Sequence, residues 1–260
     1  ATNDLGRAAW WVCNGDLRFA NDGKTLLSWG PGEKDAGGLS VWDVETRQLR
    51  HRLHGDSIGS NVKNIDLSSD GQLVATASFA NEARVWSLTS GEPMSVPLVH
   101  TGWVHNVHFS QDGEHLVTNC GDGYARVWDW KTGQLAGPPL QHGGEVYDAL
   151  FTNDGRFVIS VERNAVRVWE WNAGISVAPP LEFDGVGLQL TITPDDRKLI
   201  VGGFLKQLLI VDLSSLTNVN GDPSPNELLL RSELISGYRL HDNGGVELLP
   251  GSQWLERWSE

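Results

Sequence analysis

The sequence predicts an all-β fold built from tandem modules of four short strands, and three recurring features support this prediction. An apolar motif centred on tryptophan recurs at spacings of 44, 42, 41 and 42 residues. A turn that contains aspartate recurs with nearly the same period, and a proline–leucine–histidine element follows in the later modules. Repeats of about 40 residues made of short apolar runs and tight turns are typical of β-propeller blades.

The tryptophan motif predicts the third strand of each module. Its copies are Val41-Trp42-Asp43, Val85-Trp86-Ser87, Val127-Trp128-Asp129, Val168-Trp169-Glu170 and, with valine in place of tryptophan, Ile210-Val211-Asp212. Five modules are therefore visible. A fourth, outermost strand is expected to lead from each module to the next.

The aspartate turns predict the hairpin between the first and second strands. They are Asn21-Asp22-Gly23, Ser69-Asp70-Gly71, Gln111-Asp112-Gly113, Asn153-Asp154-Gly155 and Pro194-Asp195-Asp196. An Asp-Gly pair tolerates the positive φ angles of tight hairpin turns. An apolar strand precedes each turn, and these equivalent aspartates should lie on one rim for structural reasons.

The proline–leucine–histidine element predicts the outer edge of a blade. It reads Pro97-Leu98-Val99-His100, Pro139-Leu140-Gln141-His142 and, in degraded form, Pro180-Leu181-Glu182-Phe183. Proline lacks the backbone N–H that a central strand would need, so it favours an edge strand and protects that edge against pairing with other chains.

Together these anchors resemble the WD-repeat (tryptophan–aspartate) propeller family from about residue 13 to residue 212. The resemblance implies that histidine, a strand Ser or Thr, a turn aspartate and the tryptophan are hydrogen-bonded in series. The third repeat has the full set of four residues, which are His100, Thr118, Asp122 and Trp128. In the other repeats the set is incomplete, and the tryptophans there are Trp42, Trp86 and Trp169. We therefore expect the third blade to be the most rigid and the fifth the least.

The period stops after Asp212, which divides the chain into blades over 1–212 and a linker with a C-terminal tail over 213–260. In this tail we predict a helix that starts at Ser224-Pro225-Asn226-Glu227 and a hairpin around Asn243-Gly244-Gly245. A last short helix is predicted to start at Ser252. This tail resembles the segment that closes bacterial WD-repeat arrays, including arrays attached to serine/threonine kinases. The resemblance implies the C-terminal part of a larger protein. We expect earlier blades upstream of Ala1 and a ring that most often has seven blades.

Composition limits the classes of partner. A formal net charge of −13 disfavours nucleic acid and anionic lipid. No apolar run approaches the roughly 20 residues of a membrane span. Cys13 and Cys120 have neither disulfide nor metal spacing, and we interpret them as small buried residues. No cofactor is predicted, and the compartment stays open, with the cytoplasm as the default.

Two patterns could indicate chemistry, and both favour structural interpretations. Gly55-Asp56-Ser57-Ile58-Gly59 fits a Gly-x-Ser-x-Gly nucleophile elbow, but no helix follows it, so we interpret it as a loop between blades. His100, His105, His108 and His115 form a cluster, yet His105 and His108 leave a strand on opposite faces. We therefore predict no metal site and no catalytic residue.

Other features are assigned to surface or packing. The insertion over residues 30–38 predicts an exposed loop, and Trp130 and Trp171 share a strand face with their repeat tryptophans, so we expect them to pack. Trp103 lies in a loop between blades, where a partner contact is an alternative to packing. Trp10 and Trp29 have no repeat counterpart.

The leading hypothesis is a non-catalytic scaffold that binds another protein or another domain of its own chain. By analogy with the family, the binding rim would include Trp103, Glu145, Phe79, Arg163, Tyr124 and Phe204. The first alternative is a ligand-sensing regulatory domain of a serine/threonine kinase, with its ligand in the central channel. The second is a propeller hydrolase, which would need a serine or paired carboxylates in that channel.

Overall fold

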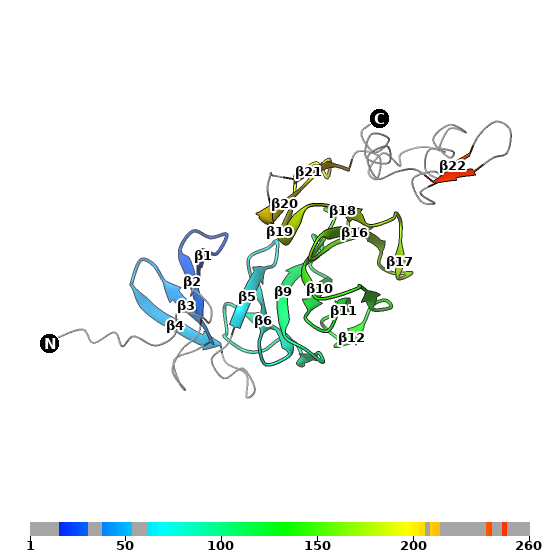
Figure 1. Cartoon of the computed structure of the whole chain (residues 1–260). Helices are drawn as coiled ribbons and strands as arrows, with labels where there is room; N and C mark the ends of the chain where they lie inside the picture. Colours follow the sequence, from blue (N-terminus) through cyan, green and yellow to red (C-terminus); the bar gives the residue numbers. More distant parts are fainter. Residues whose placement is uncertain are drawn as a thin grey trace, which may run out of the picture.

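The computed structural model describes residues 16–30, 38–53, 62–205, 209–213, 238–240 and 246–248, and all regular secondary structure among them is β. The strands form five antiparallel sheets that follow one another along the chain, and a separate hairpin. Figure 1 shows the five sheets placed in sequence order around an arc, from β1–β4 in blue to β19–β21 in yellow. The predicted all-β fold with four-stranded blades is confirmed.

We call the five sheets blades 1 to 5. Blade 1 consists of β1 (Asp16–Phe19), β2 (Thr25–Gly30), β3 (Gly38–Asp43) and β4 (Gln48–Leu53). Blade 2 consists of β5 (Val62–Leu67), β6 (Leu73–Ser78), β7 (Glu82–Ser87) and β8 (Leu98–Val99). Blade 3 consists of β9 (Val104–Phe109), β10 (His115–Cys120), β11 (Tyr124–Asp129), β12 (Gln134–Leu135) and β13 (Leu140–Gln141). Blade 4 consists of β14 (Val146–Phe151), β15 (Val158–Glu162), β16 (Ala165–Glu170), β17 (Ile175–Ser176) and β18 (Leu181–Glu182). Blade 5 consists of β19 (Gly185–Ile192), β20 (Lys198–Leu205) and β21 (Leu209–Asp212).

The fourth strand differs from the single outermost strand that was expected in each module. In blades 3 and 4 it is split into two short pieces, and both pieces pair with the strand that carries the tryptophan. The second piece, β13 or β18, is the middle of the predicted proline–leucine–histidine element, which therefore lies at the outer edge as expected. In blade 5 only three strands are found among the described residues.

The aspartate turns join the first two strands of all five blades, as predicted. In blade 2, Ser68 Oγ donates to Asp70 Oδ1 at 2.6 Å, and the amide of Gln72 donates to the same oxygen at 3.0 Å. Gly71 then takes a positive φ of 68°. In blade 5 the equivalent residue is Asp196, which has a φ of 56° although a positive φ is usually adopted by glycine. These turns together form what we call the lower rim.

The tail is described only in part. β22 (Tyr238–Leu240) pairs antiparallel with β23 (Val246–Leu248), the two strands expected on either side of Asn243-Gly244-Gly245, which itself lies outside the described residues. The helices predicted from Ser224 and Ser252, residues 31–37 of the insertion and the Gly55–Gly59 motif lie outside the described residues. The two ends of the predicted loop over 30–38 belong to strands instead, because Gly30 of β2 pairs with Gly38 of β3. The division at residue 212 remains a prediction.

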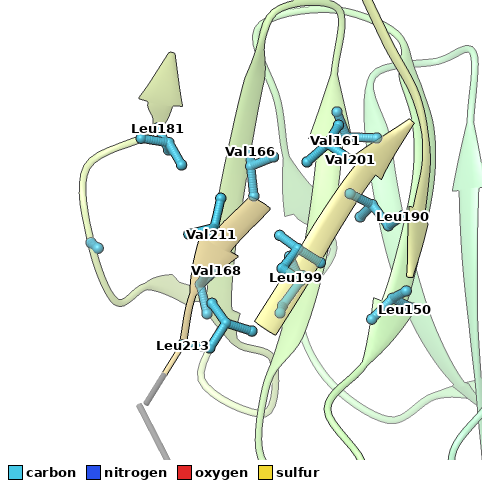
Figure 2. Close-up of a cluster of buried hydrophobic side chains, with 12 residues drawn as sticks. Leu150, Val161, Val166, Val168, Leu181, Leu190, Leu199, Val201, Val211 and Leu213 are labelled. Atoms are coloured by element: carbon cyan, nitrogen blue, oxygen red, sulfur yellow. The ribbon is translucent and has the colours of Figure 1, made fainter. Parts of the chain in front are cut away.

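Successive blades are held together by apolar side chains packed face to face. Each blade has a forward face, which packs on the next blade, and a back face, which packs on the preceding one. Between blades 4 and 5, for example, Ile159 and Val168 of the forward face meet Leu199 and Val211 of the back face. Figure 2 shows Val168, Leu199 and Val211 among the labelled side chains of this cluster. Equivalent clusters lie between blades 1 and 2, 2 and 3, and 3 and 4. Since each buried aliphatic side chain contributes about 1.5–3 kcal/mol, these clusters dominate the stability of the array.

Within blades, the tryptophan anchors a buried hydrogen-bonded brace. In blade 3, Trp128 Nε1 donates to Thr118 Oγ1 at 2.9 Å, and this hydroxyl lies 2.8 Å from His100 Nε2. His100 Nδ1 lies 2.9 Å from the carbonyl of Leu98, so Nδ1 carries the proton and Nε2 accepts from the hydroxyl. Blade 4 repeats the brace with His142, Ser160 and Trp169. In blades 1 and 2 the tryptophan donates to Ser28 and Thr76 respectively.

Burial keeps the brace histidines neutral. It lowers the pKa of both His100 and His142 to about 4, from the ordinary 6.5. The neutral ring is the form in which Nε2 can accept the hydroxyl proton. The brace is therefore intact throughout the neutral pH range.

The predicted place of Asp122 in this series is wrong. Instead of contacting His100, its carboxylate accepts hydrogen bonds from Thr101 Oγ1 at 2.7 Å and from the Arg126 guanidinium at 2.8 and 3.1 Å. Although burial opposes it, these donors lower the pKa of Asp122. His100 Nδ1 already donates to the carbonyl of Leu98 and has no proton left for Asp122. Asp122 instead stabilises the turn between β10 and β11, where it also accepts from the amide of Tyr124. In blade 4, the arginine equivalent to Arg126 is Arg167, and it pairs with Glu162 at 2.8 Å.

The outer contact between blades 3 and 4 can be tested with a glycine pair. A Cβ at Gly137 would lie 2.6 Å from the backbone oxygen of Trp171 in the next blade, whereas one at Gly144 would meet nothing within 4 Å. We expect Gly137→Ala to lower the free energy of unfolding by about 1–3 kcal/mol, as overpacking does, and Gly144→Ala to change it by less than about 0.5 kcal/mol. Urea denaturation followed by fluorescence measures both, and equal effects would contradict the close approach.

The brace can be tested at its shared hydroxyl. Thr118→Val leaves His100 Nε2 and Trp128 Nε1–H without partners inside the blade, so we expect a loss of about 2–4 kcal/mol of unfolding free energy. Thr118→Ser keeps the hydroxyl, as Ser160 does in blade 4, and should lose about 1 kcal/mol for the missing methyl group. A valine variant as stable as the serine variant would show that the brace contributes nothing.

Candidate functional site

The rim opposite the aspartate turns, which we call the upper rim, is formed by loops between blades and by turns between second and third strands. The innermost strands reach it through bulges, which are register shifts near Val62, Val104, Val146 and Gly187. A bulge adds one unpaired residue and re-aims its side chain. In blades 2, 3 and 4 the extra residues are Lys63, His105 and Tyr147. Their side chains lie next to one another on the upper rim.

His105 is the centre of a hydrogen-bonded group on this rim. Lys63 Nζ contacts His105 Nδ1, and His105 Nε2 contacts Glu145 Oε1. Since an ammonium group can only donate, Nδ1 accepts and Nε2 carries the proton that is donated to the carboxylate. Burial and the charge of Lys63 lower the pKa of His105. The ring is therefore neutral and links a cation of blade 2 to the Glu145 carboxylate next to blade 4.

Aromatic side chains surround this group. The ring of Tyr147 stacks on His105 with centroids 6.1 Å apart. The rings of Phe79 and Trp103 meet edge to face at 5.3 Å, and Lys63 Nζ lies 5.5 Å above the Phe79 ring. Trp103 remains 57% exposed although one edge is held in this contact. The rim thus presents a large aromatic surface on a fixed support.

Of the six rim residues predicted from sequence, three join one network. Phe79, Trp103 and Glu145 are connected through Lys63 and His105. Arg163 is exposed. Burial and the charge of Glu145 raise the pKa of the neighbouring Tyr147, and the positive charge of Arg163 opposes this rise. Tyr124 instead faces Arg126 at 5.1 Å. Phe204 is 79% exposed at the end of β20 and has no ring contact among the described residues.

Sequence reasoning missed Lys63, His105 and Tyr147 as rim residues. Their spacing carried a usable signal, because they occupy equivalent positions 42 residues apart. Each follows the valine that opens an innermost strand. The bulge also left a mark in the apolar pattern, because Val62, Ile65 and Leu67 are spaced by three and then by two residues, and the next two innermost strands repeat this break in alternation.

A second polar group lies deeper, where the innermost strands line the inside of the arc. Asn64 donates to Asn106, Asn106 donates to Asp148 Oδ1 at 2.7 Å, and the amide of Leu190 donates to Asp148 Oδ2 at 2.9 Å. Four innermost strands, β5, β9, β14 and β19, are thereby tied in sequence. We call this chain of side chains the hub ladder.

His108 lies between two carboxylates beside the hub ladder. Its Nε2 is 3.1 Å from Asp148 Oδ1, and its Nδ1 is 3.8 Å from Asp66 Oδ2. Arg18 of blade 1 pairs with the other oxygen of Asp66 at 3.1 Å. Burial alone would lower the pKa of His108, but Asp148 and Asp66 outweigh burial and raise it. When protonated, the ring bridges carboxylates of blades 2 and 4 from its place in blade 3.

A cavity of about 340 Å³ opens beside this group. Its lining includes polar side chains from both ends of the array, with Arg18 from blade 1 and Gln189 and Thr191 from blade 5. The remaining lining includes Asn64, His108 and Asp148. A small polar molecule would fit such a volume.

The four histidines of the predicted cluster do not converge on one site. His100 belongs to the brace, His105 to the upper rim, His108 to the hub, and His115 packs on Trp171 at 5.1 Å. No group of three or more His, Cys, Asp or Glu side chains that could hold a metal is found among the described residues. Cys120 is buried with a free thiol, and burial raises its pKa to about 11, which makes it a weak nucleophile.

The additional tryptophans are mostly packing residues, as predicted for two of them. Trp130 donates to the carbonyl of Gly113 and Trp171 to that of Gly155, both at 2.9 Å. Trp29 is buried and donates to the carbonyl of Lys63 at 3.4 Å. Trp10 lies outside the described residues. Trp103 is the exposed exception.

Comparison with known proteins identifies the repeats. Residues 47–87 and 91–129 match the family model described as WD domain, G-beta repeat. The chain is similar to NACHT domain- and WD repeat-containing protein 1 of Mus musculus, with 34% identity over 82 residues. It is also similar to the WD repeat-containing protein 3 homolog of Dictyostelium discoideum, with 31% identity over 64 residues. The two matched segments span the outer strand of blade 1, blade 2 and the first three strands of blade 3.

These similarities are local. They cover 29% and 25% of this chain, and 5% and 7% of the two relatives. Both relatives are eukaryotic, so the predicted bacterial and kinase-linked context receives no support from them. Within the described ranges, no helix has the length and apolar character needed to cross a membrane.

The hub geometry predicts an unusual histidine titration. The imidazole pKa of His108, followed by NMR, should lie above 6.5, and Asp66→Asn should lower it because one flanking carboxylate is neutralised. The stabilisation that this charge provides is fully present below pH 6.5 and is lost as pH rises through the folded-state pKa. A His108 pKa that Asp66→Asn leaves unchanged would contradict the arrangement.

Proposed function

We propose that this chain is a non-catalytic protein-interaction scaffold whose upper rim carries the binding surface. WD repeats generally serve in protein interactions, and the two matched segments contribute Lys63, Phe79 and Trp103 to this rim. The partner is another protein or another domain of the same chain. The observation that carries the proposal is the half-exposed indole of Trp103, held edge to face by Phe79.

The arrangement around Trp103 fits the physics of an interaction hot spot. Tryptophan supplies a large contact area at little cost in side-chain entropy, and the most important interface residues are enriched in Trp, Tyr and Arg. Phe79 and the Lys63–His105–Glu145 group fix the surrounding surface before a partner arrives. Such preorganisation reduces the entropy lost on binding. Arg163 and Phe204, both exposed, extend the same rim.

The alternative is a ligand-sensing regulatory domain, in its narrower form attached to a serine/threonine kinase. The cavity of about 340 Å³ beside the hub ladder supports it, because polar groups from several blades converge there. Most of them are already bonded to one another, however, including Asn106, His108 and Asp148. We therefore favour the upper rim as the functional surface.

An affinity-capture experiment tests the scaffold proposal. Wild-type chain, Trp103→Ala and Glu145→Gln are immobilised and compared for the proteins that they retain from native extract. The control is Val99→Ala, at an exposed position on the outer strand β8. We expect Trp103→Ala to reduce retention by roughly tenfold or more, as loss of a hot spot does, and Val99→Ala to match wild type. Identical retention by wild type and Trp103→Ala would contradict the proposal.

A further inference from the structure

His105 makes both of its hydrogen bonds on the upper rim only as a neutral ring. Lys63 Nζ donates to the bare Nδ1 of the ring, and the Nε2–H of the ring donates to Glu145. The side chain of His105 is 7% exposed, so water has little access to replace a partner that is lost. The link between Lys63 and His105 therefore depends on the absence of a proton from Nδ1.

Protonation of His105 sets two cations against each other. The added N–H points from Nδ1 at the Lys63 ammonium, so a donor faces a donor and a positive charge faces another. The loop before β14 brings Glu145 to the ring, and β14 brings Tyr147, which stays uncharged at neutral and acidic pH because its pKa is raised. The turn after β10 contributes Gly121, which has no side chain. Since Glu145 still accepts from Nε2–H of the protonated ring, the contact that opens is the one with Lys63.

Lys63 connects this proton to the exposed indole of the rim. Its ammonium lies 5.5 Å from the centroid of the Phe79 ring, and Phe79 meets Trp103 edge to face at 5.3 Å. When Lys63 moves away, the attraction between its charge and the Phe79 ring is lost. Phe79 is then less restrained, and Phe79 is the ring that holds the edge of Trp103. A proton on His105 therefore changes the support of Trp103 through Lys63 and Phe79.

The neighbouring histidines respond to acid in a different way. Burial and the nearby ammonium lower the pKa of His105, so its neutral form prevails above pH 6.5 and is lost as pH falls through the lowered pKa. His108 on the same strand has a raised pKa, so it takes up its proton first and strengthens its bridge between two carboxylates. His100 and His142 have a pKa of about 4, so the braces stay closed at about pH 5. Mild acid therefore opens the rim while the hub and the braces beneath it hold.

We propose that His105 is a pH switch of the upper rim. The neutral ring holds Lys63 against Phe79 and keeps the surface around Trp103 ready to bind. Protonation releases Lys63, loosens this surface and weakens binding, so a partner held at neutral pH dissociates in mild acid. This regulation rests on the proposed function, because it acts on the same surface.

An NMR titration of the full chain from about pH 8 to about pH 5 tests the switch without a partner. We expect the indole N–H resonance of Trp103, assigned with Trp103→Phe, to shift with the same midpoint as the His105 ring. His105→Gln is the matched control, because the glutamine amide can accept from Lys63 and donate to Glu145 but gains no proton. In this variant the Trp103 resonance should stay constant.

A second variant checks the cation that opposes protonation. Lys63→Gln removes the positive charge at Nδ1, so the midpoint of the His105 titration should rise. The proposal is overturned if the Trp103 resonance does not move in wild type, or if it moves equally in His105→Gln. An unchanged His105 midpoint in Lys63→Gln would overturn it as well.

Affinity capture at about pH 7.5 and at about pH 5 connects the switch to binding. Retention by wild type should fall by roughly threefold or more at the lower pH, because the cation–π contact and the preorganised surface are lost together. His105→Gln should retain equal amounts at both pH values. Equal retention by wild type at both values would show that the switch does not control binding and would overturn the proposal. Failure of the scaffold function itself gives a different result, since Trp103→Ala then matches wild type at about pH 7.5 whatever the titration shows.

Discussion

Each blade of this protein depends on an apolar face that it cannot cover by itself. A sheet of four short strands buries one face against the blade before it and the other against the blade after it. The clusters of buried residues all lie at these contacts, and several of their members are fully inaccessible. Stability in such an array is roughly a sum of intrinsic module terms and nearest-neighbour terms. Blades with two neighbours should therefore be more stable than blades with one.

Polar side chains give this apolar stack its register. The brace of His100, Thr118 and Trp128 connects three strands within a blade. The hub ladder connects innermost strands between blades, ending at the carboxylate of Asp148. Buried networks that satisfy all their members rigidify a structure, whereas partly satisfied ones are costly. The upper rim should be rigid for the same reason, because hydrogen bonds among Lys63, His105 and Glu145 connect blades 2 and 3 with the loop that enters blade 4.

The sequence predicted features that repeat and missed those that depend on register or neighbours. The tryptophan period and the aspartate turns located the strands, and the brace in blade 3 followed from the family resemblance, apart from Asp122. Phe79, Trp103 and Glu145 were predicted for the rim, but Lys63 and Tyr147 were not, because a bulge re-aims them. The pairing of Glu162 with Arg167 was also missed, since acid and base lie on different strands.

Hydrogen exchange measured blade by blade tests directly whether neighbours set stability. Amides of β10 and β11 in blade 3 should exchange most slowly, because this blade has two covered faces and the brace. Amides of β2 in blade 1 and β20 in blade 5 should exchange fastest among the second strands. Equal protection in all five blades, or the slowest exchange in blade 5, would show that stability does not come from packing between neighbours.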